Sequence, residues 1–427
     1  MSAPHTIRRN KKPLETHVIS VVDLGKWLGM MPMLPWFVIS ILWVVFIGLN
    51  YVYATHTDSG LNAFLAYYQG AEALLNNAPL YNGLDGWIYL YPPLFAQMLM
   101  PIATLDNYDV AVLLWYVINV ALLMGTLFSL SRYVPPARAK LLWIAPIVFL
   151  PFWQALYLGQ VTTIMLALLT FAWICMREDR AVIAGMLLAL ASWIKVFPAI
   201  LILYFIFKRD WRVLRGVVLL GTVLAIAQVL ISGPDIMFEF FDILLSLTAG
   251  GQPEATYENL SILAFVSRLF QHNDKVIPIF VDDNLFTIIR WGITAFIIGI
   301  SVIAIWYSGA STKAKQINWR FDIEYSLMIM TILLFGGTLW ISGLPPLLLL
   351  YVLLLRNVDK FHSPFWMKAM GVLSFMLITT YQPLILILMK EYLDVITLSL
   401  GFFGVLILWF LLIQQILQAK PVHSVGR

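Results

Sequence analysis

This chain is built from apolar segments long enough to cross a lipid bilayer, separated by short clusters of Lys and Arg. The first such segment, residues 36–54, contains no charged residue. A helix needs about 20 consecutive apolar residues to span the hydrocarbon core of a membrane. Hydrophobic residues make up 61% of the 427 and charged residues only 12%, which is too apolar for a water-soluble fold. We therefore expect an all-α polytopic membrane protein.

The basic clusters predict which ends of the helices face the cytoplasm, because loops rich in Lys and Arg stay on that side. The clusters lie at residues 8–26, 132–140, 177–180, 208–215, 313–320, 356–368 and 420–427. By contrast, the segment 232–284 carries eight carboxylates and two basic residues, and the segment 55–108 carries no Lys or Arg. We expect a multi-pass protein of the cell membrane with both termini in the cytoplasm.

These constraints predict a single membrane domain over residues 34–418, with about twelve transmembrane helices. Residues 1–33 are expected to form a cytoplasmic N-terminal tail, because no signal-peptide core and cleavage site follow their basic residues closely. Residues 419–427 are expected to form a C-terminal tail, and 55–108 and 232–284 are the large outer loops. The approximate spans are 36–54, 109–130, 141–157, 161–176, 181–194, 196–207, 214–231, 285–308, 324–341, 344–356, 366–389 and 395–418.

Three shorter segments depart from simple crossings. The apolar run 92–104 is too short to span a bilayer, so we expect a re-entrant or interfacial helix on the outer face. The run 181–207 begins and ends beside cytoplasmic charge, which predicts two short helices that turn near residues 193–195. Residues 235–248 have apolar side chains at helical spacing, which suits a helix lying on the membrane surface.

Polar side chains on the predicted outer face come from separate parts of the chain. Asp58 closely follows the first span, and Lys195 interrupts an apolar run at the turn between two short helices. A charged group at such a position is energetically unfavourable unless water solvates it or it has a function in the protein. The candidate site residues are Asp58, Tyr67, Tyr68, Tyr91, Gln160, Lys195, Asn259, Ser261 and Arg268.

These residue types suit the transfer of a sugar from a polyprenyl phosphate to a hydroxyl group. Such a reaction needs a base for the acceptor hydroxyl, cations for the phosphate, and aromatic and polar side chains for the sugar. Asp58 is the candidate base, and Lys195 and Arg268 are the candidate phosphate ligands. The candidates for substrate binding are Tyr67, Tyr68, Tyr91, Gln160, Asn259 and Ser261.

Each candidate also has a structural interpretation. Asp58 suits an ordinary solvated loop carboxylate, and Lys195 suits a lysine that snorkels to lipid headgroups. Arg268 lies on an amphipathic stretch, which is typical of either a phosphate ligand or an interfacial anchor. Tyr67 and Tyr68 suit packing as well as contact with a sugar.

The sequence gives no support for a metal, a cofactor or a nucleic-acid partner. His56 and His272 lie in outer loops without the spacing of metal ligands. There is no Walker loop, dinucleotide-binding fingerprint or serine nucleophile elbow. The basic residues are spread between apolar spans, which indicates control of topology and not binding of nucleic acid. The single cysteine, Cys175, lies in an apolar span and suggests no thiol chemistry.

Four passages resemble one family of membrane enzymes. They are Tyr-Tyr-Gln-Gly-Ala-Glu-Ala-Leu-Leu at 67–75 with Ala-Pro-Leu-Tyr at 78–81, Tyr-Leu-Tyr-Pro-Pro-Leu-Phe at 89–95 with Met-Pro at 100–101, Leu-Gly-Gln at 158–160 with Ile-Lys-Val-Phe-Pro at 194–198, and Glu-Asn-Leu-Ser at 258–261 with Arg268. In order and spacing they are similar to glycosyltransferase family 87, the polyprenol-phosphate-sugar-dependent enzymes that include mycobacterial phosphatidylinositol-mannoside mannosyltransferases. The similarity covers roughly residues 55–270.

The resemblance implies a GT-C fold, a catalytic Asp in the first outer loop, and metal-independent transfer with inversion. We therefore expect a GT-C-type helical bundle that moves a hexose, with mannose as the first candidate, from a polyprenyl-phosphate donor to a lipid or glycan acceptor on the outer face. The alternative is a polytopic transporter or lipid flippase, although no inverted repeat or matching mid-span charges favour it. A non-catalytic membrane scaffold is a third interpretation.

Overall fold

The computed structural model describes residues 33–81, 89–105, 107–249, 255–272, 276–313, 316–357, 364–388 and 394–418. Within these ranges the regular elements are helices. There is also one isolated β-bridge, between Asn259 and Trp340. This confirms the predicted all-α class. The predicted C-terminal tail, and the N-terminal tail up to residue 32, lie outside the described residues.

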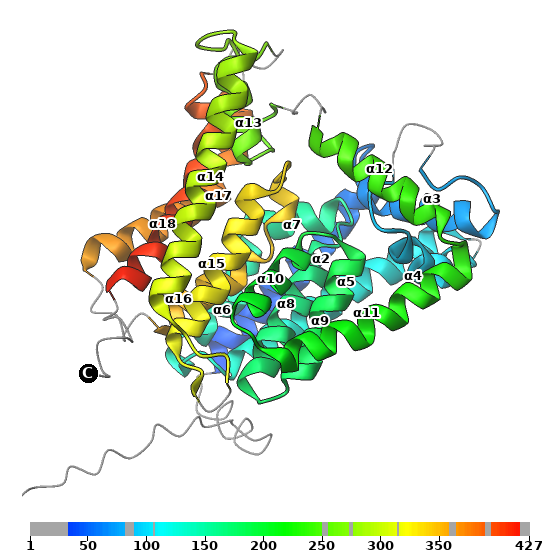
Figure 1. The fold of residues 1–427 in the computed structure, drawn as a ribbon, viewed down its shortest axis with the longest axis horizontal. Coiled ribbons are helices and arrows are strands. Elements are labelled where there is room, and N and C mark those ends of the chain that lie inside the picture. Colours follow the sequence, from blue (N-terminus) through cyan, green and yellow to red (C-terminus); the bar gives the residue numbers. More distant parts are fainter. Residues whose placement is uncertain are drawn as a thin grey trace, which may run out of the picture.

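Long and short helices follow one another along the described part of the chain. In chain order they are α2 (Met33–His56), α3 (Asn62–Leu75), α4 (Pro93–Ala103), α5 (Tyr108–Ser131), α6 (Pro136–Val148), α7 (Leu150–Tyr157), α8 (Thr162–Arg177), α9 (Ala181–Ile194), α10 (Pro198–Phe207), α11 (Trp211–Ser232), α12 (Asp235–Ala249), α13 (Ile262–Phe270), α14 (Asp283–Ser308), α15 (Trp319–Phe335), η2 (Ile341–Gly343), α16 (Leu347–Asn357), α17 (Phe365–Leu388), η3 (Thr397–Ser399) and α18 (Leu400–Gln418). Figure 1 shows α13, α14, α17 and α18 along one side of the bundle, α3, α4 and α12 along the other, and α2, α7, α8 and α9 between them.

Several helices are long and apolar enough to cross a membrane. In the described part of the chain there are five such helices, or six if the bent pair α6 and α7 counts as one span. The five are α2, α5, α11, α14 and the segment formed by η3 and α18. Most of the other predicted spans are shorter apolar helices, so twelve complete crossings remain a prediction.

The side chains of α11 show why such helices need lipid around them. Of its 22 residues only Val213, Gly216 and Gln228 are buried. Val218 is 64% exposed and Leu230 is 80% exposed. A continuous apolar surface of this kind is unfavourable in water, whereas a helix satisfies its own backbone hydrogen bonds within hydrocarbon. The helix therefore suits a lipid-facing position.

Small residues bring α9 and α11 into close contact. A Cβ atom on Gly185 would lie 1.9 Å from the carbonyl oxygen of Val213, and one on Gly216 would lie 1.9 Å from the carbonyl oxygen of Val182. Only glycine fits at these two positions, as is common where helices pack within membranes. The contact fixes α9, and therefore the residues at its C-terminal end.

The prediction of two short helices in residues 181–207 is confirmed. α9 ends at Ile194, and α10 begins at Pro198, which suits the first turn of a helix. Lys195 lies in the break with an extended backbone. The predicted surface helix 235–248 forms α12, and the predicted short helix 92–104 forms α4. Their placement at a membrane surface remains a prediction.

Two of the predicted helices are wrong in their bounds. Residues 141–157 do not form one straight span, because α6 and α7 meet at an angle of 50°. Pro151 is the second residue of α7 and offers no N–H to continue the hydrogen bonds of α6. The predicted helix 324–341 instead ends at Phe335, where Gly336 and Gly337 introduce an irregular segment.

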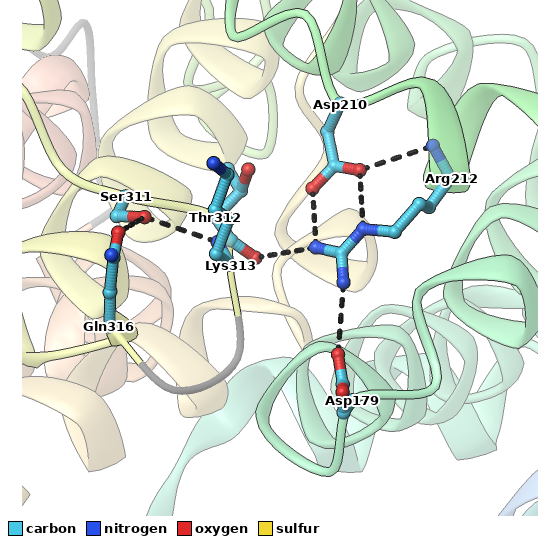
Figure 2. A network of polar contacts seen from close by, with 7 residues as sticks. All are labelled: Asp179, Asp210, Arg212, Ser311, Thr312, Lys313 and Gln316. Carbon is cyan, nitrogen blue, oxygen red and sulfur yellow. Dashed lines mark hydrogen bonds and ion pairs between the residues drawn. The ribbon is translucent and has the colours of Figure 1, made fainter.

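At one end of the bundle, charged side chains join three turns that the sequence assigned to the cytoplasm. Figure 2 shows Arg212 between Asp179 and Asp210, with Nη1 and Nη2 at 2.9 and 3.2 Å from a carboxylate oxygen of each. Nη2 also donates to the carbonyl oxygen of Thr312 at 3.3 Å. The turns before α9, before α11 and after α14 therefore lie together, as the distribution of basic residues predicts.

Two further acids on α15 are neutralised at the same end. Asp322 and Glu324 are both fully buried. Arg177 Nη2 lies 3.1 Å from Asp322 Oδ2, and Lys208 Nζ lies 2.6 Å from Glu324 Oε2. Tyr204 also donates to Glu324 at 2.9 Å. A buried carboxylate requires such partners, and at this end of the bundle both of these buried carboxylates have them.

Candidate functional site

Four of the predicted site residues come together at the other end of α8 and α9. Tyr67 lies on α3, Tyr91 in the loop before α4, Gln160 in the turn before α8, and Lys195 in the break after α9. The Tyr67 hydroxyl lies 2.9 Å from the Tyr91 hydroxyl and 3.0 Å from Gln160 Oε1. The Tyr91 hydroxyl lies 3.3 Å from the same Gln160 oxygen. We call Tyr67, Tyr91, Gln160 and Lys195 the tyrosine–lysine cluster.

Lys195 contributes a positive charge to this cluster. Its Nζ atom lies 5.5 Å from the centre of the Tyr91 ring, which is the geometry of a cation–π contact. Among the described residues, no carboxylate lies within ion-pair distance of Lys195, and its side chain is only partly buried. A cation held by an aromatic ring and left without a carboxylate partner is suited to binding an anion.

The Tyr67 hydroxyl is suited to donating a hydrogen bond and not to acting as a base. Burial, reinforced by the neighbouring Tyr91, raises the pKa of the Tyr67 hydroxyl well above its usual value. The hydroxyl therefore stays protonated at neutral pH and acts as a hydrogen-bond donor. Burial also raises the pKa of Tyr89, whose hydroxyl donates to the Pro92 carbonyl at 2.9 Å and fixes the Tyr-Pro-Pro loop.

The turn between α7 and α8 holds these parts together. Its Tyr157 carbonyl accepts from the Leu61 N–H at 2.8 Å, and its Gly159 carbonyl accepts from the Trp115 indole at 2.8 Å. Gly159 has a φ of +67°, and a Cβ atom there would lie 2.6 Å from the Cβ of Phe64. Only glycine combines this backbone conformation with this close approach. The Leu-Gly-Gln pattern therefore places Gln160 against α3.

The loop that carries Asp58 is attached to the same turn. The Thr57 hydroxyl donates to the Tyr157 hydroxyl at 3.0 Å, and Ser59 also hydrogen-bonds to it. Asp58 itself is exposed, and its carboxylate has no hydrogen bond or ion pair within the described residues. The structure thus ties the Asp58 loop to the turn that supplies Gln160. A shared cavity for Asp58 and Lys195 remains a prediction.

Tyr68 does not join the cluster. Successive residues on a helix point about 100° apart, so Tyr68 leaves α3 on a different side from Tyr67. Its ring packs edge-on against Tyr108 with 5.2 Å between the ring centres, and it is buried. This contact favours a packing role over the predicted sugar contact.

Asn259, Ser261 and Arg268 form a separate buried framework. Asn259 Oδ1 accepts from the N–H groups of Ser261 and Leu339, at 3.2 and 3.1 Å. Ser261 Oγ accepts from the N–H of Ala264 at 3.1 Å and so caps the start of α13. Both residues are fully buried. Their side chains hold the backbone, and this geometry does not support the predicted sugar contacts.

Arg268 is part of this framework and does not lie in an open site. Its guanidinium donates to the carbonyl oxygens of Ala255, Thr256 and Asn259 and to the Ser399 hydroxyl. The whole residue is fully buried. Because these N–H groups are bound to the protein, the structure gives no support to the predicted contact of Arg268 with a donor phosphate. The interfacial-anchor interpretation is not supported either.

Sequence reasoning missed two side chains near these elements. Tyr157 anchors the Asp58 loop, and only its place next to the Leu-Gly-Gln pattern pointed to it. Glu258 is partly buried, and its Oε1 lies 3.4 Å from Gln154 Nε2 on α7. It directly precedes Asn259 in the sequence, but it is one of eight carboxylates in that loop, and nothing in the sequence distinguished it from the others.

An apolar cavity of about 570 Å³ lies among α13, α14 and α18. It is lined by Phe265, Ile293, Phe296, Ile297, Phe402, Phe403, Leu406, Ile407, Trp409 and Phe410. These helices lie across the bundle from α3 and α4 (Figure 1), so the cavity is separate from the tyrosine–lysine cluster.

One family model matches a long stretch of the chain. The model of glycosyltransferase family 87 matches residues 89–335, which include Tyr91, Gln160 and Lys195. No solved structure matches the chain at a significant level.

Two relatives from Mycobacterium tuberculosis have sequences similar to parts of the chain. A polyprenol-phosphate-mannose-dependent alpha-(1-2)-phosphatidylinositol mannoside mannosyltransferase is 30% identical over 172 residues, covering 34% of this chain and 39% of the relative. A polyprenol-phosphate-mannose-dependent alpha-(1-2)-phosphatidylinositol pentamannoside mannosyltransferase is 25% identical over 224 residues, covering 48% of this chain and 50% of the relative. The chain thus spans half or less of the length of these relatives. The family match covers more than half of the chain, and the chain therefore belongs to glycosyltransferase family 87.

Proposed function

We propose that this protein is an integral membrane glycosyltransferase that transfers a hexose from a polyprenyl-phosphate donor. Mannose is the first candidate, because both relatives are named as mannosyltransferases that depend on polyprenol-phosphate-mannose. The acceptor is a lipid or glycan hydroxyl on the outer face of the cell membrane. The proposal includes a GT-C-type bundle of about twelve spans with both termini in the cytoplasm.

The observation that carries the proposal is the meeting of Lys195 with Tyr67, Tyr91 and Gln160. Lys195 binds the donor phosphate and stabilises the negative charge that develops on it as the sugar leaves. The hydroxyl groups of Tyr67 and Tyr91 and the Gln160 amide form a polar surface for the sugar hydroxyls. Arg268 has no part in phosphate binding in this proposal, because it is enclosed in the protein.

Asp58 supplies the base in the proposed reaction. Its carboxylate takes the proton from the acceptor hydroxyl while that oxygen bonds to the anomeric carbon of the donor sugar. The bond between the anomeric carbon and the phosphate oxygen breaks on the opposite side, and polyprenyl phosphate leaves with both bonding electrons. At the anomeric carbon one bond forms and one breaks, so the sugar is transferred with inversion and without a covalent enzyme intermediate.

The test is the transfer of radiolabelled mannose from polyprenyl-phosphate mannose in membranes that contain the protein. Asp58→Asn should lower the rate about 100-fold or more, because it removes a general base. Asp235→Asn is the matched control, since Asp235 is an exposed carboxylate on α12 in the second outer loop, and this variant should transfer at the wild-type rate.

Two results would contradict the proposal. Undiminished transfer by Asp58→Asn removes this residue from the mechanism. If the wild type transfers no sugar yet moves a labelled lipid between leaflets of a vesicle, the protein is a transporter or flippase.

A further inference from the structure

Glu258 has no role in the mechanism described so far. It lies in the loop before α13, and its carboxylate contacts Gln154 on α7. Gln154 is buried, whereas Glu258 is only partly buried. Glu258 therefore presents a carboxylate at the edge of the helix that also anchors the Asp58 loop.

The distance along α7 brings Glu258 and Asp58 into one region. Gln154, which contacts Glu258, and Tyr157, which anchors the residues on either side of Asp58, are three residues apart on this helix. Side chains at this spacing are neighbours on a helix surface, with about 5–6 Å between their Cβ atoms. The Glu258 carboxylate and the two residues that flank Asp58 thus contact neighbouring side chains of α7.

The backbone of Glu258 is held from the side of η2. Its carbonyl accepts from the Ile341 N–H at 3.0 Å, and the next residue, Asn259, forms the β-bridge to Trp340. The turn at residues 341–343 is itself fixed to α8, because Thr162 donates to the Ser342 carbonyl at 2.6 Å. Glu258 is therefore placed by rigid elements and not by a free loop.

Arg268 adds to this support of the loop. Its guanidinium binds the carbonyl of Asn259 at 2.6 Å and that of Thr256, the residues that flank Tyr257 and Glu258. It also donates to Ser399 at 3.1 Å, which connects the loop to the start of α18. Burying this cation costs desolvation free energy. Its hydrogen bonds to several backbone carbonyls hold the loop in one conformation.

We infer that Glu258 binds the acceptor hydroxyl groups, and that Arg268 and Asn259 are positioning residues that hold it. The inference rests on the proposed sugar transfer. A carboxylate accepts two or more hydrogen bonds from neighbouring hydroxyls, which is the chemistry that recognises a sugar or polyol acceptor. Asp58 then removes the proton from one hydroxyl while Glu258 fixes the acceptor through others. The donor stays with Lys195 and the tyrosines.

The test measures transfer from polyprenyl-phosphate mannose to a phosphatidylinositol mannoside, with donor and acceptor varied separately. Glu258→Gln should raise the KM for the acceptor about 10-fold and leave the KM for the donor within twofold, because a charged hydrogen bond is lost only on the acceptor side. Glu258→Asp should keep part of the acceptor affinity. Glu72→Gln on α3, another partly buried carboxylate, is the control and should leave both KM values unchanged.

A double-variant comparison tests the positioning residues. Arg268→Lys should raise the KM for the acceptor in the wild-type background and add little in the Glu258→Gln background, because both changes act through one contact. If Arg268→Lys does not fold, Ser399→Ala removes a single hydrogen bond from the same guanidinium and should give a smaller effect of the same kind. A purely structural role would lower the amount of folded protein equally in both backgrounds and leave KM unchanged.

The outcomes separate this inference from the proposed function. If the wild type transfers mannose and Glu258→Gln has a wild-type acceptor KM, the inference is wrong and the proposed function stands. A raised donor KM in Glu258→Gln would also overturn it. If the wild type transfers no sugar, both fail together.

Discussion

The cations at the two ends of α8 and α9 have different partners. At the end with Arg177 and Lys208, each cation contacts a fully buried carboxylate, Asp322 or Glu324. At the other end, Lys195 contacts an aromatic ring and no carboxylate of the described residues. Charges paired inside the protein are satisfied and contribute to the fold, whereas a cation beside tyrosine hydroxyls remains available to an anion. We refer to the first as the structural end and, because we propose that it binds the donor phosphate, to the second as the binding end.

The largest expected effect comes from breaking a pair at the structural end. Lys208→Ala leaves Glu324 buried without its cation, and removal of one partner of a buried pair costs about 3–5 kcal/mol of stability. We expect a large loss of folded protein after extraction in detergent, and a lowered melting temperature for the remainder. Normalised to folded protein, sugar transfer should stay near the wild-type rate. A variant that is stable but inactive would reverse the roles of the two ends.

The next effect concerns the binding end. Lys195→Gln removes the cation that we propose holds the donor phosphate, and we expect kcat/KM for the donor to fall about 100-fold. The melting temperature should stay within a few degrees of the wild type, because Lys195 has no buried carboxylate partner in the described part of the chain. Transfer rates and melting curves measured on the same preparations check this. A large stability loss with full activity would show that Lys195 is structural.

A smaller effect is expected within the tyrosine–lysine cluster. Tyr67→Phe removes a neutral hydrogen-bond donor, so we expect a decrease in kcat/KM of about 5- to 10-fold. Because burial raises the pKa of Tyr67, its hydroxyl stays protonated through the physiological range. The variant should therefore keep the pH profile of the wild type between pH 6 and about 9. A changed alkaline limb in that range would indicate that Tyr67 acts as an acid or base.

The smallest effect is expected at the surface of the structural end. The Arg212 and Asp179 side chains are 38% and 60% exposed, so their ion pair is screened by water. Asp179→Asn removes this pair and keeps the pair of Arg212 with the buried Asp210, so it should lower stability by less than about 1 kcal/mol and leave transfer unchanged. Melting curves at low and high salt measure this contribution, which should shrink as salt is added. An effect as large as that of Lys208→Ala would show that exposed and buried pairs are not distinguishable here.

The sequence predicted those parts of the structure that depend on charge placement. The break around Lys195 followed from cytoplasmic charge at both ends of residues 181–207. The meeting of Tyr67, Tyr91 and Gln160 agrees with the prediction that all three lie on the outer face. Both results depend on topology, which Lys and Arg control strongly.

Other features depended on packing that no local pattern contains. Tyr67 and Tyr68 are neighbours in sequence, yet only one joins the cluster, because the rotation of α3 decides which side each faces. The amphipathic pattern around Arg268 did not reveal that its polar side meets backbone carbonyls instead of water. The bend between α6 and α7 likewise depends on how the two halves pack. Periodicity gives the faces of a helix, but not what each face contacts.

The most direct test of the difference between the two ends is the binding of polyprenyl phosphate to the purified protein in detergent. Lys195→Gln should raise the dissociation constant for polyprenyl phosphate at least about 10-fold. Arg290→Gln is the matched control, because Arg290 also lies over an aromatic ring, Trp291, at 4.8 Å, but outside the cluster, and it should bind within twofold of the wild type. Equal binding by wild type and Lys195→Gln would contradict the assignment of this cluster as the phosphate site.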